Sequence, residues 1–345
     1  MSNKIKVLIV DDSAVVRKIL STGLSKDPNI EVVGAAPDPF VARDKIVALK
    51  PDVVTLDVEM PRMDGISFLQ RLMAYYPLPV IMVSSLTQAG CETTLKALEV
   101  GAVDFVAKPT LDVSNSLNEV IDVLAEKIKE SAKIKIQKKL VKKTEIKRVQ
   151  TQALIKTTHK IVAIGASTGG TEALKEVLTQ MPPNSPGILI VQHMPKLFTK
   201  AFADRLNSLC SIRISEAKDG ESIVPGIALI APGDYHMELR RSGARYYVTT
   251  TQEPPVRRHR PSVEVLFESV AKYAGANAIG VIMTGMGDDG AHGLLKMKEA
   301  GANTIAQDEE SCVVFGMPKE AIKLGAAEKI VPLDKIPSAI LSFLN

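Results

Sequence analysis

The chain has 345 residues, of which 46% are hydrophobic and 24% charged, and its formal net charge is +4. This length favours two domains, and the composition excludes a wholly disordered or fibrous chain. No apolar run approaches the roughly 18 residues that cross a bilayer, and the first residues lack a signal-peptide core. The three cysteines are far apart, which excludes a disulfide scaffold and a cysteine-based zinc site, so we expect a cytoplasmic protein without direct membrane insertion.

Residues 1–125 alternate short aliphatic runs with helical patterns. Strands are expected at Lys6–Val10, Glu31–Ala35, Val53–Asp57, Val80–Ser84 and Phe105–Lys108. Helical spacing is present at Ala14–Ser25, Pro39–Leu49 and Asn118–Glu130. Strands that alternate with helices in this way predict an α/β fold, a doubly wound domain with a parallel sheet covered on both faces.

Residues 126–157 form a basic segment that we interpret as a partly helical linker. From Lys127 to Lys160 there are 12 Lys and Arg residues against two acids, so the rest of the chain is mildly acidic. The apolar positions of this segment follow neither a helical nor a strand period. Because aromatic residues make up only 4% of the chain, a solvated linker is favoured over a surface for nucleic acid or anionic lipid.

A second α/β pattern occupies residues 158–345. Strands are expected at Ile161–Ile164, Gly187–Val191, Ile212–Glu216, Ile227–Ala231, Tyr246–Thr250, Ala278–Met283 and Asn303–Gln307. Helices are expected at Thr171–Gln180, Leu197–Ser208, Ser262–Tyr273 and Gly290–Ala300. We predict a second doubly wound, mainly parallel sheet, to which the short strands between Ile212 and Thr250 add an antiparallel edge.

Polar residues follow the strands of the first domain. Asp11 and Asp12 end the first predicted strand, Asp57 ends the third, and Ser84 and Lys108 end two others. Ligands of parallel sheets bind at this edge, and three acids there would repel one another unless a cation neutralised them. Mg²⁺ prefers such oxygen ligands, so a magnesium site is predicted, although each acid alone could equally cap a helix.

These residues also carry a family resemblance. The matching residues are Asp11-Asp12, Asp57, Met60-Pro61-Arg62-Met63-Asp64-Gly65, Ser84-Ser85 and Lys108-Pro109. Residues 1 to about 125 therefore resemble response-regulator receiver domains. The resemblance implies that a histidine kinase phosphorylates Asp57, and that Mg²⁺ is held by Asp11, Asp12, Asp57 and the backbone carbonyl of Glu59. It also implies that Lys108 offsets phosphoryl charge and that Ser84 and Phe105 are switch positions, with Phe105 lacking the frequent Tyr hydroxyl.

A glycine-rich turn opens the second domain. Gly165-Ala-Ser167-Thr-Gly169 contains G-x-S-x-G, a pattern that lifts a serine above the edge of a sheet. A phosphate-binding loop is disfavoured because no Lys follows the last glycine. The pattern is common by chance, and a tight strand–helix turn with a capping Ser or Thr is the plain alternative. The sequence thus makes Ser167 a candidate nucleophile.

A serine nucleophile needs a base and an acid, and the sequence offers several. Of five histidines, only His193 directly follows the neighbouring strand; the others are His159, His236, His259 and His292. Candidate acids after later strands are Asp288, Asp289 and Asp308. The chain order Ser…His…Asp differs from the order in α/β-hydrolases, which disfavours an ordinary lipase or esterase fold.

The second domain carries a further resemblance. Its matching motifs are Gly-Ala-Ser-Thr-Gly-Gly at 165–170, Gln-His-Met-Pro at 192–195, Ala-Pro-Gly-Asp at 231–234, Arg-His-Arg-Pro-Ser-Val at 258–263, Thr-Gly-Met-Gly-Asp-Asp-Gly at 284–290 and Ser-Cys-Val-Val-Phe-Gly-Met-Pro at 311–318. The full chain resembles the chemotaxis protein-glutamate methylesterases, the CheB family. The resemblance places the catalytic triad on Ser167, His193 and Asp289, and oxyanion support on the Met286 backbone N–H and Thr168.

The resemblance implies a serine hydrolase that is activated by phosphorylation and inhibited by its unphosphorylated receiver domain. Its expected partners are methyl-accepting chemoreceptors, as substrates, and a chemotaxis histidine kinase. Demethylation of glutamate methyl esters and deamidation of glutamines would need no cofactor, and we expect a monomer that binds no DNA. The alternatives are a response regulator with a DNA-binding second domain, and a silent adaptor with a degenerate hydrolase domain.

Overall fold

The computed structural model describes residues 4–60, 63–108, 114–134 and 160–344. The chain divides into two compact units, one within residues 1–143 and the other within 144–345. Most of the predicted linker, residues 135–157, lies outside the described residues, as does His159. No helix among the described residues is long and apolar enough to span a membrane.

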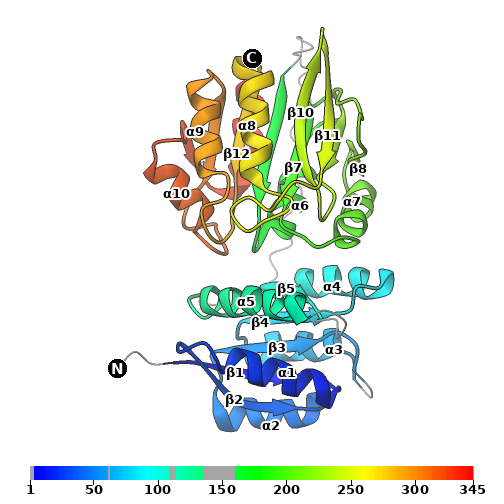
Figure 1. The fold of residues 1–345 in the computed structure, drawn as a ribbon, viewed down its shortest axis with the longest axis vertical. Coiled ribbons are helices and arrows are strands. Elements are labelled where there is room, and N and C mark those ends of the chain that lie inside the picture. Colours follow the sequence, from blue (N-terminus) through cyan, green and yellow to red (C-terminus); the bar gives the residue numbers. More distant parts are fainter. Residues whose placement is uncertain (1–3, 61–62, 109–113, 135–159, 345) are drawn as a thin grey trace. The chain divides into compact units, whose positions relative to one another are not determined.

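In its described residues, the first unit is a five-stranded parallel sheet with five helices. Figure 1 shows these elements. Its elements are β1 (Ile5–Val10), α1 (Ala14–Leu24), β2 (Ile30–Ala36), α2 (Pro39–Leu49), β3 (Val53–Asp57), α3 (Gly65–Tyr75), β4 (Val80–Ser84), α4 (Gln88–Val100), β5 (Asp104–Ala107) and α5 (Ser114–Ser131). The strand order is β2-β1-β3-β4-β5, so β1 and β3 are neighbours at the centre. All five predicted strands are present, and the doubly wound prediction is confirmed.

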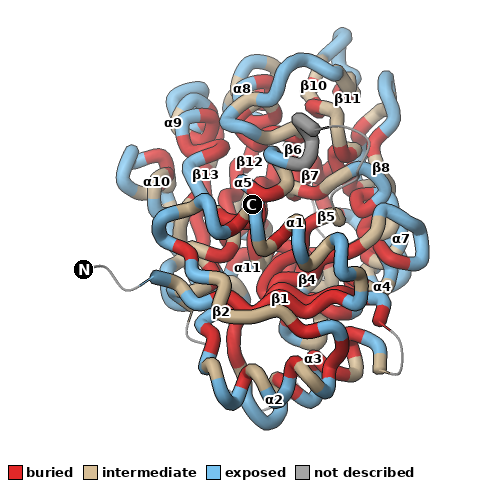
Figure 2. Tube along the Cα trace, turned by 60° about the horizontal axis from the view of Figure 1, so that its bottom comes forward, coloured by how far each residue is buried: buried red, intermediate tan, exposed pale blue. Residues whose placement is uncertain are grey.

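Burial explains why these segments form strands and helices. Consecutive residues of β1 and β4 are buried on both faces of the sheet, which parallel sheets require (Figure 2). The helices α1, α2, α3 and α4 are each preceded by a capping residue, whose side chain accepts a hydrogen bond from a backbone N–H of the first turn. These residues are Ser13, Asp38, Asp64 and Thr87. The helix expected at Asn118–Glu130 is present as part of α5, which ends at Ser131. Residues 126–131, which we had placed in the linker, pack with the first unit, because Ile128 is fully buried in the core with residues of α1.

The second unit is built on a seven-stranded parallel sheet. Its elements are β6 (Ile161–Ala166), α6 (Gly170–Leu178), β7 (Gly187–Gln192), α7 (Phe198–Leu209), β8 (Arg213–Glu216), β9 (Ile227–Ile230), β10 (His236–Ser242), β11 (Arg245–Thr251), α8 (Val263–Tyr273), β12 (Ala278–Ile282), α9 (Ala291–Glu299), β13 (Asn303–Gln307), α10 (Met317–Lys323), β14 (Lys329–Val331) and α11 (Ile336–Ser342). Short 3₁₀ turns lie at Gly275–Asn277 and Leu333–Lys335. The strand order is β14-β13-β12-β6-β7-β9-β8. A seven-stranded sheet contradicts the alternative of a small DNA-binding domain.

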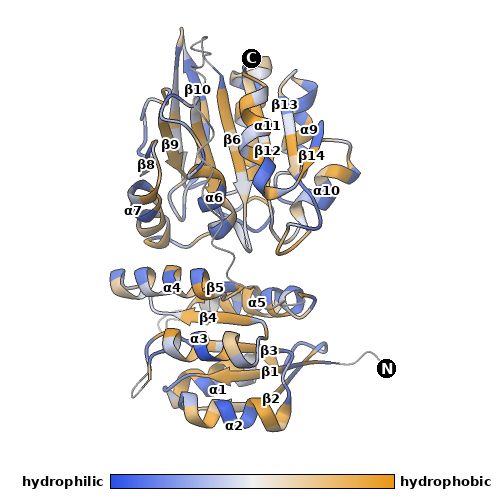
Figure 3. Cartoon of the chain, turned by 180° about the vertical axis from the view of Figure 1, so that it is seen from behind, coloured by the Kyte–Doolittle hydropathy of each residue, from blue (hydrophilic) through white to orange (hydrophobic). Residues whose placement is uncertain are grey.

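The antiparallel strands differ from the prediction. β8 and β9 pair in parallel within the main sheet, and the antiparallel pair is a separate hairpin of β10 and β11. The hairpin buries Met237, Leu239 and Val248 in the same core cluster as Phe267 of α8. Figure 3 shows the apolar strands of the main sheet inside, with hydrophilic residues on outer helix surfaces. Packing against α8 therefore replaces hydrogen bonding to the sheet edge.

Strand order determines where a ligand can bind in the second unit. From β6 the chain builds one half of the sheet through β7, and later returns to the other side of β6 with β12. Doubly wound sheets bind ligands beyond the carboxyl ends of strands at such a reversal. The loops that follow β6, β7 and β12 meet at this point.

Candidate active site

Ser167 lies in the turn between β6 and α6. Its backbone N–H donates to the carbonyl of Thr284 at 3.0 Å, which ties the turn to the loop after β12. Gly169 has a φ of 78°, a left-handed conformation that glycine adopts without strain. A Cβ on Gly170 would lie 2.1 Å from Gln192 Oε1 and 2.8 Å from Ala166 Cβ, so a side chain there would displace these neighbours. This turn places Ser167 at the edge of the sheet, where the residue is 8% exposed.

His193 connects Ser167 with Asp289. Its Nδ1 lies 3.1 Å from Ser167 Oγ, and its Nε2 lies 2.8 Å from Asp289 Oδ2. A carboxylate only accepts hydrogen bonds, so Nε2 carries the proton that it donates to Asp289. Nδ1 then has a free lone pair that accepts the Ser167 hydroxyl proton. This arrangement is that of a nucleophile, a general base and an orienting acid.

Asp289 is an anion fixed by several donors. It is 1% exposed, and besides His193 it accepts hydrogen bonds from Ser262 Oγ and from the backbone N–H groups of Val263 and Glu264, at 2.8, 2.7 and 3.1 Å. Burial alone would raise the pKa of Asp289. The hydrogen bonds, led by the one from His193, outweigh burial and hold the pKa below its usual value. Asp289 is therefore ionised at neutral pH.

The other candidate acids lie elsewhere. Asp288 is exposed and its carboxylate forms an ion pair with Arg257. Asp308 accepts hydrogen bonds from the backbone N–H and hydroxyl of Ser311. Of the three acids that the sequence offered, the structure brings Asp289 to His193.

The remaining described histidines have other surroundings. His236 is buried, with Nε2 facing the carbonyl of Pro254 and Nδ1 accepting from the backbone N–H of Ser262. His292 is exposed in the first turn of α9. His259 stacks on the ring of His193, with ring centroids 3.7 Å apart. No pattern in the sequence indicates this stacking, because the two residues are 66 positions apart.

The two groups predicted to support the oxyanion, the Met286 backbone N–H and Thr168, belong to loops close to Ser167. A Cβ on Gly285 would lie 2.8 Å from Ser167 Cβ, so the loop that leads into Met286 passes directly beside the nucleophile. Thr284 Oγ1 donates to the carbonyl of Thr168 at 3.0 Å and so connects this loop to the Ser167 turn. Met286 is half-buried and Thr168 buried at this edge. Their roles stay predictions.

Acidic residues gather at the sheet edge of the first unit. Carboxylate oxygens of Asp11, Asp12 and Asp57 lie within 4.8 Å of one another. Lys108 Nζ lies 2.8 Å from Asp57 Oδ2 and 3.2 Å from Asp11 Oδ2. Burial raises the pKa of Asp57 to about 6, although hydrogen bonding to Lys108 lowers it, and the negative charge of Asp11 adds to the increase. Burial also raises the pKa of Asp11, against the opposing charge of Lys108.

This cluster suits a hard cation. Asp11 Oδ2 is buried and makes no hydrogen bond within the part of the chain that the structure describes, although Lys108 lies near it. The side-chain donors are all carboxylate oxygens, the ligands that Mg²⁺ prefers, and Asp12 remains exposed to solvent. The backbone N–H of Glu59 donates to Asp57 Oδ1 at 3.1 Å, so Glu59 borders the cluster. The residues present therefore fit a magnesium ion.

The two predicted switch residues are buried beside this edge. Ser84 ends β4, and its hydroxyl donates to the carbonyls of Ser85 and Gly90, each at 3.3 Å. Phe105, on β5, is 5% exposed. Both positions are thus occupied by side chains that pack inward, and their part in switching stays a prediction.

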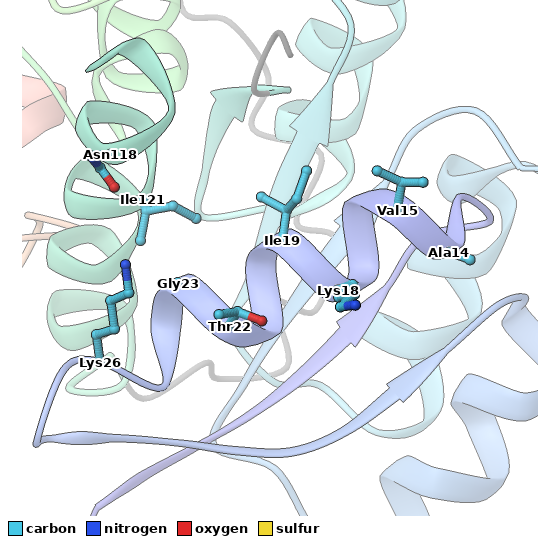
Figure 4. A pocket seen from close by; sticks show the side chains of 9 residues that line it. All are labelled: Ala14, Val15, Lys18, Ile19, Thr22, Gly23, Lys26, Asn118 and Ile121. Carbon is cyan, nitrogen blue, oxygen red and sulfur yellow. The ribbon is translucent and has the colours of Figure 1, made fainter. Parts of the chain in front are cut away.

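A groove on the first unit lies apart from these polar residues. It has a volume of about 490 Å³ and lies between α1 and α5 (Figure 4). Its lining is mostly apolar, with two lysines, and consists of Ala14, Val15, Lys18, Ile19, Thr22, Gly23, Lys26, Asn118 and Ile121. None of the candidate reacting residues lines it.

Known protein families match both units of the chain. Residues 162–340 match the CheB methylesterase family, and residues 7–121 match the response regulator receiver domain. A protein-glutamate methylesterase/protein-glutamine glutaminase of Syntrophus aciditrophicus is 62% identical over 98% of this chain and 99% of its own. One of Chromohalobacter salexigens is 56% identical over 99% of this chain and 96% of its own. The crystal structure of the Thermotoga maritima CheB methylesterase catalytic domain is 41% identical, with a TM-score of 0.52, covering 53% of this chain and 97% of that one.

Proposed function

The chain belongs to the CheB methylesterase family, and from this premise we propose that Ser167, His193 and Asp289 carry out its ester hydrolysis. The protein is a protein-glutamate methylesterase/protein-glutamine glutaminase with a receiver domain, a phosphorylation-regulated enzyme of chemotaxis. Its substrates are glutamate γ-methyl esters and glutamine side chains of chemoreceptors. The observation that carries the residue assignment is the position of His193, within hydrogen-bond reach of both Ser167 and Asp289.

The reaction uses these three side chains in two steps. Ser167 Oγ attacks the γ-carbonyl carbon while His193 Nδ1 takes the hydroxyl proton, and Asp289 stabilises the resulting imidazolium. The backbone N–H of Met286, with Thr168, supports the oxyanion. The intermediate expels methanol, or ammonia from a glutamine, which receives the proton from His193 and leaves an acyl group on Ser167. His193 then takes a proton from water as that water attacks the acyl carbonyl carbon. It gives the proton to Ser167 Oγ when the second intermediate breaks down, which releases glutamate and regenerates Ser167.

Asp57 is the phosphorylated residue of the receiver domain. Lys108 lies against its carboxylate and offsets negative charge there. Asp11, Asp12, Asp57 and the backbone carbonyl of Glu59 would hold Mg²⁺, which when bound supplies further positive charge. A chemotaxis histidine kinase is the phosphodonor, and changes at Ser84 and Phe105 carry the signal. The unphosphorylated receiver domain inhibits the catalytic domain. We assign residues 1–125 to the receiver domain, with α5 continuing to Ser131, and 158–345 to the catalytic domain.

Methanol release tests the assignment. A methylated cytoplasmic fragment of a chemoreceptor is incubated with the full-length protein, with and without a small-molecule phosphodonor. We expect methanol release that rises with the donor and is abolished in Ser167→Ala. A wild-type protein that binds the fragment but releases no methanol would instead support the silent-adaptor alternative.

A further inference from the structure

One segment of the second unit, Val256–Glu264, contacts both His193 and Asp289, and we call it the clamp segment. Its carboxyl end supplies the three donors to Asp289 described above, and its His259 ring stacks on His193. We propose that the clamp segment positions the His193 imidazole for catalysis and that His259 is its positioning residue. The inference rests on the proposed function, since it concerns the same hydrolysis.

The stacking restrains rotation of the His193 ring. The two rings are nearly parallel, with an interplanar angle of 11°. The His193 ring can rotate about its Cβ–Cγ bond, and such a rotation carries its two nitrogens out of line with Ser167 Oγ and Asp289 Oδ2. Hydrogen bonds weaken steeply with misalignment. A flat ring 3.7 Å away on one face limits that rotation.

The turn before His259 is tightly closed. The backbone N–H of Val256 donates to the carbonyl of His259 at 3.1 Å, and the N–H of His259 donates back to Val256 at 2.9 Å. The two residues between them, Arg257 and Arg258, have φ values of 51° and 69°. Asn and Gly are favoured at such positions, so two arginines are held there only by their surroundings. The ion pair of Arg257 with Asp288 is one such restraint.

The other end of the segment is fixed to the catalytic loops. The Val263 side chain lies so close to Gly165 and Gly290 that a Cβ on either would approach its Cγ1 to 2.2 and 2.3 Å. Glu264 Oε2 accepts a hydrogen bond from the backbone N–H of Gly290 at 3.1 Å, directly after Asp289. The support that carries His259 is therefore anchored to the same strand ends as Ser167 and Asp289.

Two substitutions of His259 test the proposal in the full-length protein. His259→Ala removes the ring, and His259→Phe keeps a flat ring without its nitrogens. Methanol release from the methylated receptor fragment gives kcat and KM, and the low-field proton NMR signal of His193 Nε2–H reports the bond to Asp289. His292→Ala, at an exposed position, is the matched control. Because His259 is only half-buried, all three variants are expected to fold, which thermal unfolding checks.

For His259→Ala we expect kcat to fall about ten-fold with KM within about two-fold, and the NMR signal to broaden, because misplacement of a reacting group lowers turnover. His259→Phe should restore at least half of kcat and keep the signal. Unchanged kcat in His259→Ala overturns the proposal, as does an equal loss in both variants, which would assign a chemical role to the imidazole. A raised KM alone would mean substrate contact. If His259→Ala does not fold, the kcat of His259→Phe still decides. A wild type without activity would instead refute the proposed function.

Discussion

Asp289→Asn tests the triad most sharply. Both carboxylate oxygens of Asp289 accept hydrogen bonds, so the NH₂ group of an amide would have to face a hydrogen-bond donor. Oδ2 accepts from His193 Nε2 and from the Val263 N–H, and Oδ1 accepts from Ser262 Oγ and from the Glu264 N–H. The amide NH₂ must occupy one of these two positions. In either orientation it faces a backbone N–H that cannot reverse its direction.

The orientation of the side-chain amide in Asp289→Asn determines how far the substitution lowers kcat and how far it lowers the free energy of unfolding. An NH₂ at the Oδ2 position faces Nε2–H, so His193 must shift its proton to Nδ1 and can no longer accept the Ser167 proton. A carboxylate-to-amide change of this kind in a serine protease lowers kcat about 10⁴-fold, and we expect 10³- to 10⁴-fold here. The unsatisfied backbone N–H should cost about 1–3 kcal/mol of unfolding free energy in the second domain.

Methanol release and chemical unfolding measure the two effects, and Asp288→Asn is the matched control. Asp288 is exposed, and its ion pair with Arg257 is a surface pair worth at most about 1 kcal/mol. We expect Asp288→Asn to stay within about three-fold of wild-type kcat. The reverse ranking of the two variants would transfer the acid role to Asp288, and equally mild effects would refute a role for either carboxylate in orienting His193.

Three further predictions concern the nucleophile, the regulation and the phosphorylation site. Ser167→Ala should lower methanol release by several orders of magnitude. Adding His193→Ala should change it little further, since triad residues act as a unit. If Ser167→Ala kept a tenth of wild-type activity, the assignment of the nucleophile would be contradicted. A fragment of residues 156–345 should be active without phosphodonor, whereas full-length Asp57→Ala should stay at basal activity when the phosphodonor is present. If the fragment released methanol no faster than the unphosphorylated full-length protein, inhibition by the receiver domain would be excluded. In chelator at pH 7, Asp57→Asn should raise the free energy of unfolding of the first domain by up to about 3 kcal/mol, measured by denaturant titration.

The sequence located most of the strands because the signal of a strand is local, but it did not predict Lys329–Val331. Aliphatic runs between helical patterns located every strand of the first unit, and strand ends then placed Asp11, Asp57 and Lys108 together. The hairpin strand His236–Ser242 was missed, although Met237 and Leu239 alternate with charged residues. Its position on α8 rather than at the sheet edge depends on side-chain packing, which no local pattern encodes.

The choice between adjacent acids needed contacts that are distant in sequence. Spacing placed Asp288 and Asp289 equally well after β12. What distinguishes them is the set of donors from Ser262, Val263 and Glu264, which lie 25 to 27 residues away in sequence. The stacking of His259 on His193 is non-local in the same way. Sequence reasoning thus found the edge of the sheet where Ser167 and His193 meet, whereas the resemblance singled out Asp289.

Two carboxylates of this chain, each 1% exposed, have opposite pKa shifts, and the difference lies in their donors. Asp289 accepts four hydrogen bonds and stays ionised. Among the described residues, the donors to Asp57 are Lys108 and the Glu59 N–H, and Asp57 also lies near the negative charge of Asp11. Raising the pKa of Asp57 from 3.8 to about 6 means that its ionised form destabilises the fold by about 3 kcal/mol at pH 7. Because the pKa of Asp57 is higher in the folded than in the unfolded protein, protonated Asp57 favours the folded state. This contribution to the free energy of unfolding is complete below about pH 4 and is lost as the pH rises through about 6. The advantage of Asp57→Asn should therefore disappear near pH 3.5; an equal advantage at pH 3.5 and pH 7 would show that the ionised charge of Asp57 is not its cause.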